Sequence, residues 1–565
     1  IATQCSASIL LCPFSMILTF RRKLFYEMDH QSSRTYSIFS RLISDEIAIM
    51  AILGIIVGLA GGFGAIAFRY LIGFFQSISY GSAGELLDVV STIPWYFRIG
   101  IPALGGLVVG PIVYFLAREA KGHGVPEVME AVAMKYGIIR KRIVFIKALV
   151  SAICIGTGGS VGREGPIVQI GSAVGSTLGQ MFKVSENRMK TLVGCGAAAG
   201  IAATFNAPIA GFMFALEIIL GEFGVATFSP VIISAVTATA VSRHFLGDSP
   251  AFVVPAYQLV SPLEFPLYAI MGLFCALVGV TFTIVLYRGE DLFDDIKFPE
   301  YLKAVLGGLI LGAMGLLFPQ ILGIGYGAID LALVQELSWG LMFLLVIGKI
   351  LATSITIGSG GSGGIFAPSL FIGSMAGGFF GGVVHHLFPA VTASTGAYSI
   401  VGMGAVVAAT THGPLSAILI LFEMTGDYKI ILPLMITCII SRLMAGRLLK
   451  ESIYTFKLIR RGVDIRSGKE VNVLKSISVK GVMNQEVETM LDSLSLREFS
   501  EKISKTKYNS FPVVNDKGNL TGVLSFLDYN TAVFNKDLND LVVVKDLATL
   551  DVVTIAVDDN IYNDL

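Results

Sequence analysis

The sequence predicts an all-α polytopic membrane protein that ends in a small α/β domain, and three observations indicate this fold class. Of the 565 residues, 54% are hydrophobic and 15% are charged, whereas soluble globular proteins carry about 25% charged residues. Charge is also uneven, because 27 of the 103 residues from 463 to 565 are charged, against 55 of the 462 before them. Long apolar segments recur through that first part. Lysine plus arginine and aspartate plus glutamate both total 41, so no nucleic-acid partner is expected.

Residues 1–44 are expected to form a cytoplasmic N-terminal segment outside the membrane domain. The apolar run 9–20 is too short to span a bilayer, and it precedes Arg21-Arg22-Lys23, the reverse of the order in a secretory signal. The chain begins with isoleucine, and Met28 would make a natural start. We therefore expect residues 1–27 to be upstream read-through or a fragment.

The membrane domain is expected over residues 45–460, where apolar segments of spanning or near-spanning length recur. They are centred near residues 60, 107, 150, 175, 210, 235, 277, 312, 347, 375, 410 and 438. Many are interrupted by glycine or proline, and glycine supplies 63 of the 565 residues. In lipid, irregular backbone is tolerated only where protein or a water-filled cavity satisfies its polar groups. Such broken helices predict a transport path rather than a simple anchor.

The domain also repeats itself. Residues 162–172 align with residues 364–374 at a constant offset of 202, and both contain a Gly-x-x-x-Pro element. In a second pair, Pro208 precedes Glu217 by nine residues, as Pro414 precedes Glu423. Two structural repeats with interrupted helices at equivalent positions predict a transporter-type binding site at the repeat interface.

Each Gly-x-x-x-Pro element lies just before an apolar helix, where proline is tolerated in the first turn. The N–H groups at a helix start bind anions, and the helix dipole adds about half a positive charge. Two such starts aimed at one place would form an anion site that requires no lysine in the pore. Alternatively, the glycines serve only close helix packing. The duplication favours the anion site.

Glu164 is a carboxylate inside an apolar segment, which is costly and indicates function. An ion pair with Arg163 is the alternative explanation. As an anion at an anion-attracting helix start, Glu164 would occupy the site and exclude the substrate. Protonation would release it, so Glu164 is predicted to be a gate or a proton carrier.

A third Gly-rich turn closes with proline at residues 121–127 and offers another backbone cradle for an anion. His123 lies between two glycines there. It is either a hydrogen-bonded loop histidine or part of the anion site, where it would titrate near neutral pH. Protonated, it would add positive charge to the cradle. Neutral, it would offer one N–H donor.

These motifs resemble a known family. The elements at residues 122–126, 162–166 and 364–368 resemble, in order and spacing, the three signature motifs of CLC chloride channels and transporters. The stretches 205–208 and 422–428, and then Tyr454, are also similar. The resemblance covers about residues 45–460. It implies a homodimer in the bilayer, each subunit holding its own anion pathway built from two inverted-topology repeats.

The resemblance also implies roles for individual residues. Glu164 would be the gate, the amides of Ile365 and Phe366 would hold the central anion, and the Tyr454 hydroxyl would donate to it. His123 stands where many members have serine, and it would line the anion site with Gly124. The remaining motif positions are Gly122, Pro126, Gly162, Arg163, Gly165, Pro166, Gly364 and Pro368.

Ile218 bears on the mode of transport. Proton-coupled exchangers of the family often carry an inner glutamate at the matching position, and isoleucine cannot relay protons. The main prediction is therefore a chloride channel of the voltage-gated type that moves small monovalent anions, with proton-coupled exchange of chloride as the alternative. The protein is expected to lie in the plasma membrane.

A remote alternative is an intramembrane serine protease, because residues 360–363 resemble a Gly-x-Ser-Gly nucleophile turn. His385, His386 and His412 are the conceivable bases. The turn recurs at residues 158–160, which favours a backbone role, so no enzyme activity is predicted. The six cysteines include no Cys-x-x-Cys pair, and no metal site is expected.

After a linker at residues 461–478, residues 479–535 alternate short strands and amphipathic helices. This stretch resembles a CBS domain, which implies a cytoplasmic tail. A second copy begins at about residue 540 and is cut off at residue 565. No cofactor is required, and the resemblance leaves room for an adenine nucleotide at the CBS domains.

Overall fold

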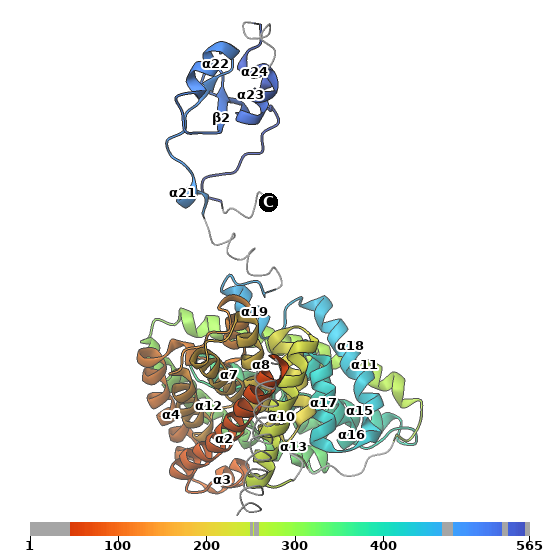
Figure 1. Ribbon diagram of the computed structural model, residues 1–565. Helices are drawn as coiled ribbons and strands as arrows, with labels where there is room; N and C mark the ends of the chain where they lie inside the picture. The colour runs from red at the N-terminus through yellow and green to blue at the C-terminus, as the bar shows by residue number, and fades with distance from the viewer. Residues whose placement is uncertain (1–45, 249–251, 253–258, 466–477, 534–540, 560–565) are drawn as a thin grey trace, which may run out of the picture. The chain divides into compact units, whose positions relative to one another are not determined.

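The computed structural model describes residues 46–248, 252, 259–465, 478–533 and 541–559 (Figure 1). It divides into two compact units, Ile1–Val463 and Asp464–Leu565. The described part of the first unit contains helices, and the described strands all lie in the second. The predicted fold class is confirmed. The N-terminal segment 1–44, most of the linker and the ends of the second CBS copy fall outside the described residues.

The first half of the membrane unit runs from α2 to α10. Its helices are α2 (Glu46–Tyr80), α3 (Leu86–Thr92), α4 (Trp95–Leu116), η1 (Arg118–Ala120), α5 (Val125–Met134), α6 (Ile143–Gly156), α7 (Glu164–Met181), α8 (Glu186–Phe205), α9 (Pro208–Phe214), η2 (Ala215–Leu220) and α10 (Val225–Leu246).

The second half continues to the end of the membrane unit. Its helices are α11 (Glu264–Asp295), η3 (Glu300–Leu302), α12 (Lys303–Leu317), η4 (Pro319–Ile321), α13 (Tyr326–Leu333), α14 (Trp339–Gly358), α15 (Phe366–Leu387), α16 (Thr395–Thr411), α17 (Pro414–Thr425), η5 (Tyr428–Ile430), α18 (Ile431–Leu448) and α19 (Thr455–Arg460).

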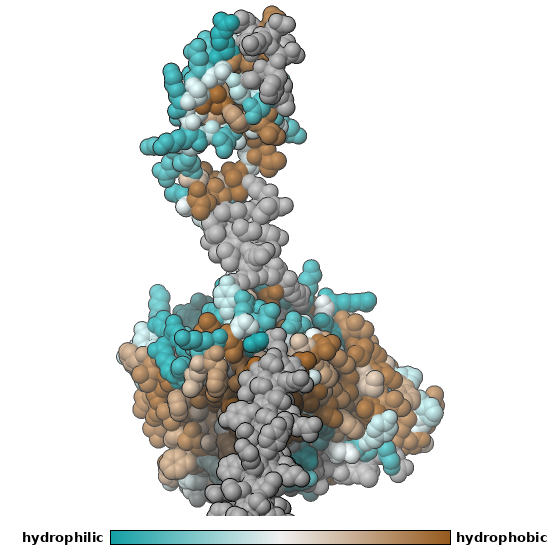
Figure 2. Space-filling view, viewed as in Figure 1, coloured by the Kyte–Doolittle hydropathy of each residue, from teal (hydrophilic) through white to brown (hydrophobic). Residues whose placement is uncertain are grey.

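Eight of the helices in the described residues are long and apolar enough to cross a membrane. They comprise α2, α4, α10, α11, α14, α15, and the segments Glu300–Leu317 and Tyr428–Leu448. Hydrophobic side chains cover the sides of this unit, and hydrophilic side chains gather at the end where α19 lies (Figure 2). Many of the exposed residues are large and apolar, among them Phe115, Phe145 and Leu317. This surface matches a lipid environment.

The two repeats pack in the same way. A Cβ on Gly171 of α7 would lie 2.2 Å from the Gly196 carbonyl oxygen of α8, and a Cβ on Gly373 of α15 would lie 2.4 Å from that of Gly402 in α16. Only glycine permits these approaches. The predicted duplication is therefore present in the packing of the two helix pairs.

The tail has a three-stranded sheet in the order β1-β2-β3. β1 (Met490–Leu491) pairs in parallel with β2 (Ser510–Val514), which pairs antiparallel with β3 (Leu520–Ser525). The helices beside it are α21 (Val479–Val482), α22 (Leu496–Ile503), α23 (Phe526–Val533) and α24 (Val544–Leu547). Phe499 and Phe511 are fully buried in its core.

Candidate functional site

The three motif loops meet at the starts of α5, α7 and α15. The Gly162 amide donates to the Gly364 carbonyl at 2.7 Å, and the Gly364 amide donates back at 2.6 Å. A Cβ on Gly165 would lie 2.2 Å from the His123 carbonyl oxygen and 2.9 Å from the Gly364 Cα. The convergence predicted from the sequence is therefore built by backbone contacts that exclude side chains at these glycines.

A buried lysine holds the first loop. Lys147, from α6, is fully buried, and its Nζ donates to the carbonyls of Ala120 at 3.0 Å and Gly122 at 2.7 Å. From the other repeat, the Ser362 hydroxyl also donates to the Ala120 carbonyl, at 2.8 Å. The loop carrying His123 is thus fixed from both halves of the protein.

The second half repeats this anchor in a loop that the sequence analysis did not single out. Lys349 Nζ donates to the carbonyls of Ile321 at 3.0 Å and Gly323 at 2.9 Å, and the Ser160 hydroxyl donates to the Ile321 carbonyl at 2.8 Å. Lys349 follows Lys147 by 202 residues, and this offset is the sequence signal that would have identified the loop. The loop leads into α13, whose first residue is Tyr326.

Glu164 begins α7 and is 1% exposed. Its Oε1 accepts a hydrogen bond from the Tyr326 hydroxyl at 2.6 Å, and its buried Oε2 has no hydrogen-bond partner among the described residues. A Cβ on Gly162 would lie 2.1 Å from Oε2, so the carboxylate lies directly over the junction of the helix starts. Within the described residues Glu164 forms no ion pair with Arg163, whose guanidinium lies over the Tyr326 ring at 5.5 Å.

His123 is fully buried, and its Nε2 lies 3.2 Å from the Tyr287 hydroxyl oxygen. That hydroxyl has one proton and donates it to the Ile453 carbonyl at 2.5 Å. Nε2 must therefore donate, which leaves Nδ1 of the neutral ring as a buried acceptor without a partner in the part of the chain that the structure describes. The expectation that neutral His123 offers an N–H to an anion is wrong for this arrangement, because Tyr287 already takes that donor.

Tyr454 follows Ile453 and is 1% exposed, with its ring 5.8 Å from that of His123. The Ile453 amide donates to the Thr410 carbonyl at 2.8 Å. This pairing, together with the Tyr287 bond, fixes the backbone that carries Tyr454 beside the first loop.

The start of α15 lies in the same region. Ile365 is its N-cap residue and Phe366 its first helical residue, both almost fully buried. The amides at a helix start have no acceptor four residues back in the helix, so they are available to an anion. The Phe366 ring packs against those of Phe205 at 5.8 Å and Phe214 at 6.2 Å, which holds the helix start in place.

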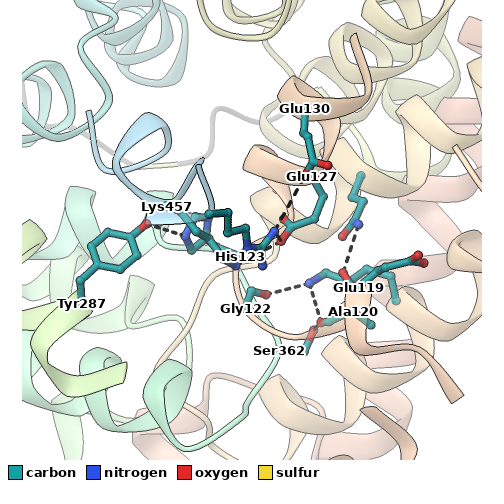
Figure 3. Close-up of polar contacts among 12 residues, drawn as sticks. Glu119, Ala120, Gly122, His123, Glu127, Glu130, Tyr287, Ser362 and Lys457 are labelled. Atoms are coloured by element: carbon teal, nitrogen blue, oxygen red, sulfur yellow. Dashed lines mark hydrogen bonds and ion pairs between the residues drawn. The ribbon is translucent and has the colours of Figure 1, made fainter. Parts of the chain in front are cut away.

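A buried ion pair adjoins His123 (Figure 3). Lys457 Nζ lies 3.1 Å from Glu127 Oε1, with only 8% and 11% of the two side chains exposed, and Arg461 lies 3.4 Å from the same oxygen. A Cβ on Gly122 would lie 2.7 Å from Lys457 Nζ. The sequence analysis attached no role to this cluster.

Two cavities approach the site. One, of about 810 Å³, is lined by Arg69, Arg163 and Tyr326 and reaches the residues around the gate. The other, of about 350 Å³, is lined in part by Lys457 and Arg460. Basic side chains outnumber acidic ones in the lining of the smaller cavity, which would raise the local concentration of anions there, whereas Glu85 and Asp330 balance the two arginines in the larger cavity.

Ile218 is 6% exposed and lies in η2, where its Cδ1 would be 2.9 Å from a Cβ on Gly413. It packs as an apolar residue. Ser362, the proposed nucleophile of the protease alternative, is fully buried, with its hydroxyl bonded to Ala120 and 2.9 Å from that of Ser151. These contacts explain the serine by loop packing, and the protease alternative is unsupported.

Comparisons with known proteins agree with this geometry. The family model described as voltage gated chloride channel matches residues 105–446, and a CBS domain model matches residues 479–534. A ClcB-like chloride channel protein of Ralstonia nicotianae is 36% identical over 420 residues, which cover 74% of this chain and 98% of the relative.

Two further relatives are exchangers by name. The H⁺/Cl⁻ exchange transporter ClcA of Klebsiella pneumoniae is 32% identical over 433 residues, which cover 74% of this chain and 91% of ClcA. The solved structure of a slow cyanobacterial Cl⁻/H⁺ antiporter is 29% identical with a TM-score of 0.67, covering 73% of this chain and 97% of the antiporter.

Proposed function

Because this chain belongs to the CLC family of chloride channels and transporters, we propose that it exchanges chloride for protons across a membrane. Anion transport follows from the family. The choice of chloride and the coupling to protons are the proposal.

The observation that carries the proposal is the position of Glu164. Its carboxylate lies over the junction of the α7 and α15 starts, where an anion would be attracted. An ionised Glu164 and a chloride ion compete for this place, because both are negative. Protonation of Glu164 removes the competition, so one residue links proton uptake to anion passage.

The relatives support exchange better than the channel prediction, since both ClcA and the cyanobacterial structure are named for proton-coupled exchange. Ile218 alone had favoured a channel. Under this proposal, water carries protons to Glu164 without a glutamate at position 218.

We propose further that the protein is a homodimer in the plasma membrane, a transporter rather than an enzyme, with its tail in the cytoplasm. Ile365, Phe366 and Tyr454 would hold the central anion. An adenine nucleotide at the CBS domain stays a prediction.

The test is a reconstitution of the full chain in chloride-loaded vesicles, with chloride efflux and proton uptake recorded together. Exchange predicts that an outward chloride gradient drives protons inward in a fixed ratio. Chloride efflux without proton uptake would instead support the prediction of a chloride channel. Retention of chloride while potassium leaks would contradict anion transport altogether.

A further inference from the structure

We propose that Tyr326 is a latch on the gate: its hydroxyl holds the ionised Glu164 carboxylate in the blocking position and releases it on protonation. This inference rests on the proposed function of Glu164 as the gate. It assigns a positioning role to a residue outside the three motifs.

The hydrogen bond itself discriminates between the two forms of the gate. The distance of 2.6 Å between the Tyr326 hydroxyl and Glu164 Oε1 is typical of a hydroxyl that donates to a charged carboxylate. Such bonds are about twice as strong as bonds between neutral groups. Since Oε2 has no partner, this bond is the main polar contact that holds the carboxylate. Protonation weakens it and frees the side chain.

The Tyr326 hydroxyl is positioned by the loop that precedes α13, which is held in place by fixed contacts. Tyr326 follows Gly325, which has φ +92° and where a Cβ would lie 2.7 Å from the Phe371 ring. Lys349 fixes the carbonyls of Ile321 and Gly323 just before it. A donor held in this way loses little entropy when it binds the carboxylate.

The ring has fixed neighbours as well. The Arg163 guanidinium lies 5.5 Å from its centre, and the Phe252 ring packs edge-on at 5.3 Å. Tyr326 also lines the 810 Å³ cavity, so it stands between that cavity and the gate. The Tyr326 ring is held by packing against Arg163 and Phe252, and removal of the hydroxyl alone leaves these ring contacts in place.

Other groups interact with Tyr326 and Glu164. Arg163 and Arg69, which line the large cavity, interact electrostatically with Tyr326, and Tyr454 interacts with Glu164. Tyr326→Phe leaves both arginines and Tyr454 in place. Because the Tyr326 hydroxyl also interacts with Arg163, the comparison with the Glu164→Gln background separates the loss of the Glu164 bond from the loss of that contact.

A hydrogen bond to a charged group changes an equilibrium by roughly tenfold to a hundredfold. In Tyr326→Phe the blocking position is less stable by that factor. We expect chloride efflux at pH 7 to rise about tenfold, and the pH of half-maximal efflux to move upward by about one unit.

The experiment compares four proteins in chloride-loaded vesicles between pH 4.5 and 7.5: the native chain, Tyr326→Phe, Glu164→Gln and the double variant. A latch that acts through Glu164 predicts a large effect of Tyr326→Phe in the native background and none beside Glu164→Gln. Tyr398→Phe is the matched control, because the Tyr398 hydroxyl is also buried but has no hydrogen-bond partner within the described ranges. An equal effect in both backgrounds, or no effect in either, overturns the latch.

An infrared titration separates this inference from the proposed function. The C=O stretch of protonated Glu164 is identified by its loss in Glu164→Gln, and its appearance is followed as the pH falls. Absorbance that appears at higher pH in Tyr326→Phe supports the latch, even in a protein that moves no chloride. A titration that does not move refutes the latch and leaves the transport proposal intact.

Discussion

Glu217 and Ser416 are joined by two hydrogen bonds across the repeat interface. The Ser416 amide donates to Glu217 Oε2 at 2.7 Å and its hydroxyl donates at 2.6 Å, while the Leu415 amide donates to Oε1 at 3.1 Å. The carboxylate of the first half thus caps the start of α17 in the second half. Because the Glu217 carboxylate accepts these three hydrogen bonds, it is poorly placed to carry protons.

A carboxylate of the second half caps a helix of the first half in the same way. Glu423 accepts from the amides of Ile209 at 3.1 Å and Ala210 at 2.6 Å, at the start of α9. We expect Glu217→Ala and Glu423→Ala to destabilise the protein by similar amounts, about 1–3 kcal/mol, because each leaves helix-start amides without an acceptor. Thermal unfolding in detergent measures this.

Both variants should retain the proton-to-chloride ratio of the native chain in vesicles. A ratio that changed in Glu217→Ala alone would assign this carboxylate to the proton route instead.

The second prediction concerns the gate. Glu164→Gln and Glu164→Ala should abolish the pH dependence due to gating and leave a more open anion path, since a neutral side chain no longer competes for the helix starts. Both should also uncouple proton movement from chloride movement. Paired recordings of chloride and protons in vesicles check this. Full pH sensitivity in either variant would exclude Glu164 as the gate.

The third prediction concerns His123, whose Nδ1 has no partner while Nε2 donates to Tyr287. A neutral Nδ1 presents a lone pair, which repels an anion, whereas a protonated Nδ1 donates to it. Burial, followed by the charges of Lys457 and Lys147, lowers the pKa of the His123 imidazole well below its ordinary value, although Glu127 acts in the opposite direction. Protonation is therefore expected below neutral pH and together with anion binding.

Isothermal titration with chloride from pH 5 to 8 tests this in Glu164→Gln, where the gate cannot titrate. Chloride affinity should rise as the pH falls, and it should stay flat once His123→Ser is added. The same pH dependence in both proteins would mean that another group titrates.

The meeting of the motif loops could be predicted from the sequence, because the glycine motifs are short and recur at a constant offset of 202 residues. The sequence analysis placed no membrane segment at α8, whose residues from Thr191 to Ala203 are all buried. α8 combines polar and charged residues in its first two turns with small residues from Gly194 to Gly200, so its mean hydropathy is low. This helix is enclosed by protein rather than lipid, so hydropathy does not detect it.

The hydrogen-bond partners of the site residues also could not be predicted from the sequence. The role of Tyr326 depends on a partner 162 residues away, and the tautomer of His123 depends on Tyr287, 164 residues away. Neither pair follows a local period. Only the placement of Lys349 as the counterpart of Lys147 would have drawn attention to the Tyr326 loop.

The fourth prediction concerns the tail. The Ser525 hydroxyl donates to Asp528 Oδ2 at 2.6 Å and the Ser525 amide at 3.0 Å, which lowers the pKa of the Asp528 carboxyl below its ordinary value. A lowered pKa contributes stability above the pKa of the unfolded chain, and this is lost as the pH falls through the folded value.

Ser525→Ala should therefore speed amide exchange at the start of α23 at pH 7, with a smaller difference from the native chain in acid. Ser504→Ala is a suitable control, because its hydroxyl bonds the Glu501 carbonyl and no carboxylate. Equal acceleration at both pH values would argue against the carboxylate contact.

The last prediction concerns the mode of transport. Ile218 carries no proton and is packed against the Gly413 backbone, so its replacement by alanine should leave proton coupling in place while Glu164→Gln removes it. If protons reach Glu164 through water, Ile218→Ala widens that route and should keep or raise the exchange rate. Ile218→Glu adds a carrier beside the route and should raise proton uptake if the inner transfer limits exchange. The same vesicle assay, with an outward chloride gradient and external pH recorded, measures all three variants. Two results together would instead support the channel prediction: the native chain dissipates the chloride gradient without proton uptake, and only Ile218→Glu couples the two ions. The native chain would then lack coupling because of the side chain at position 218.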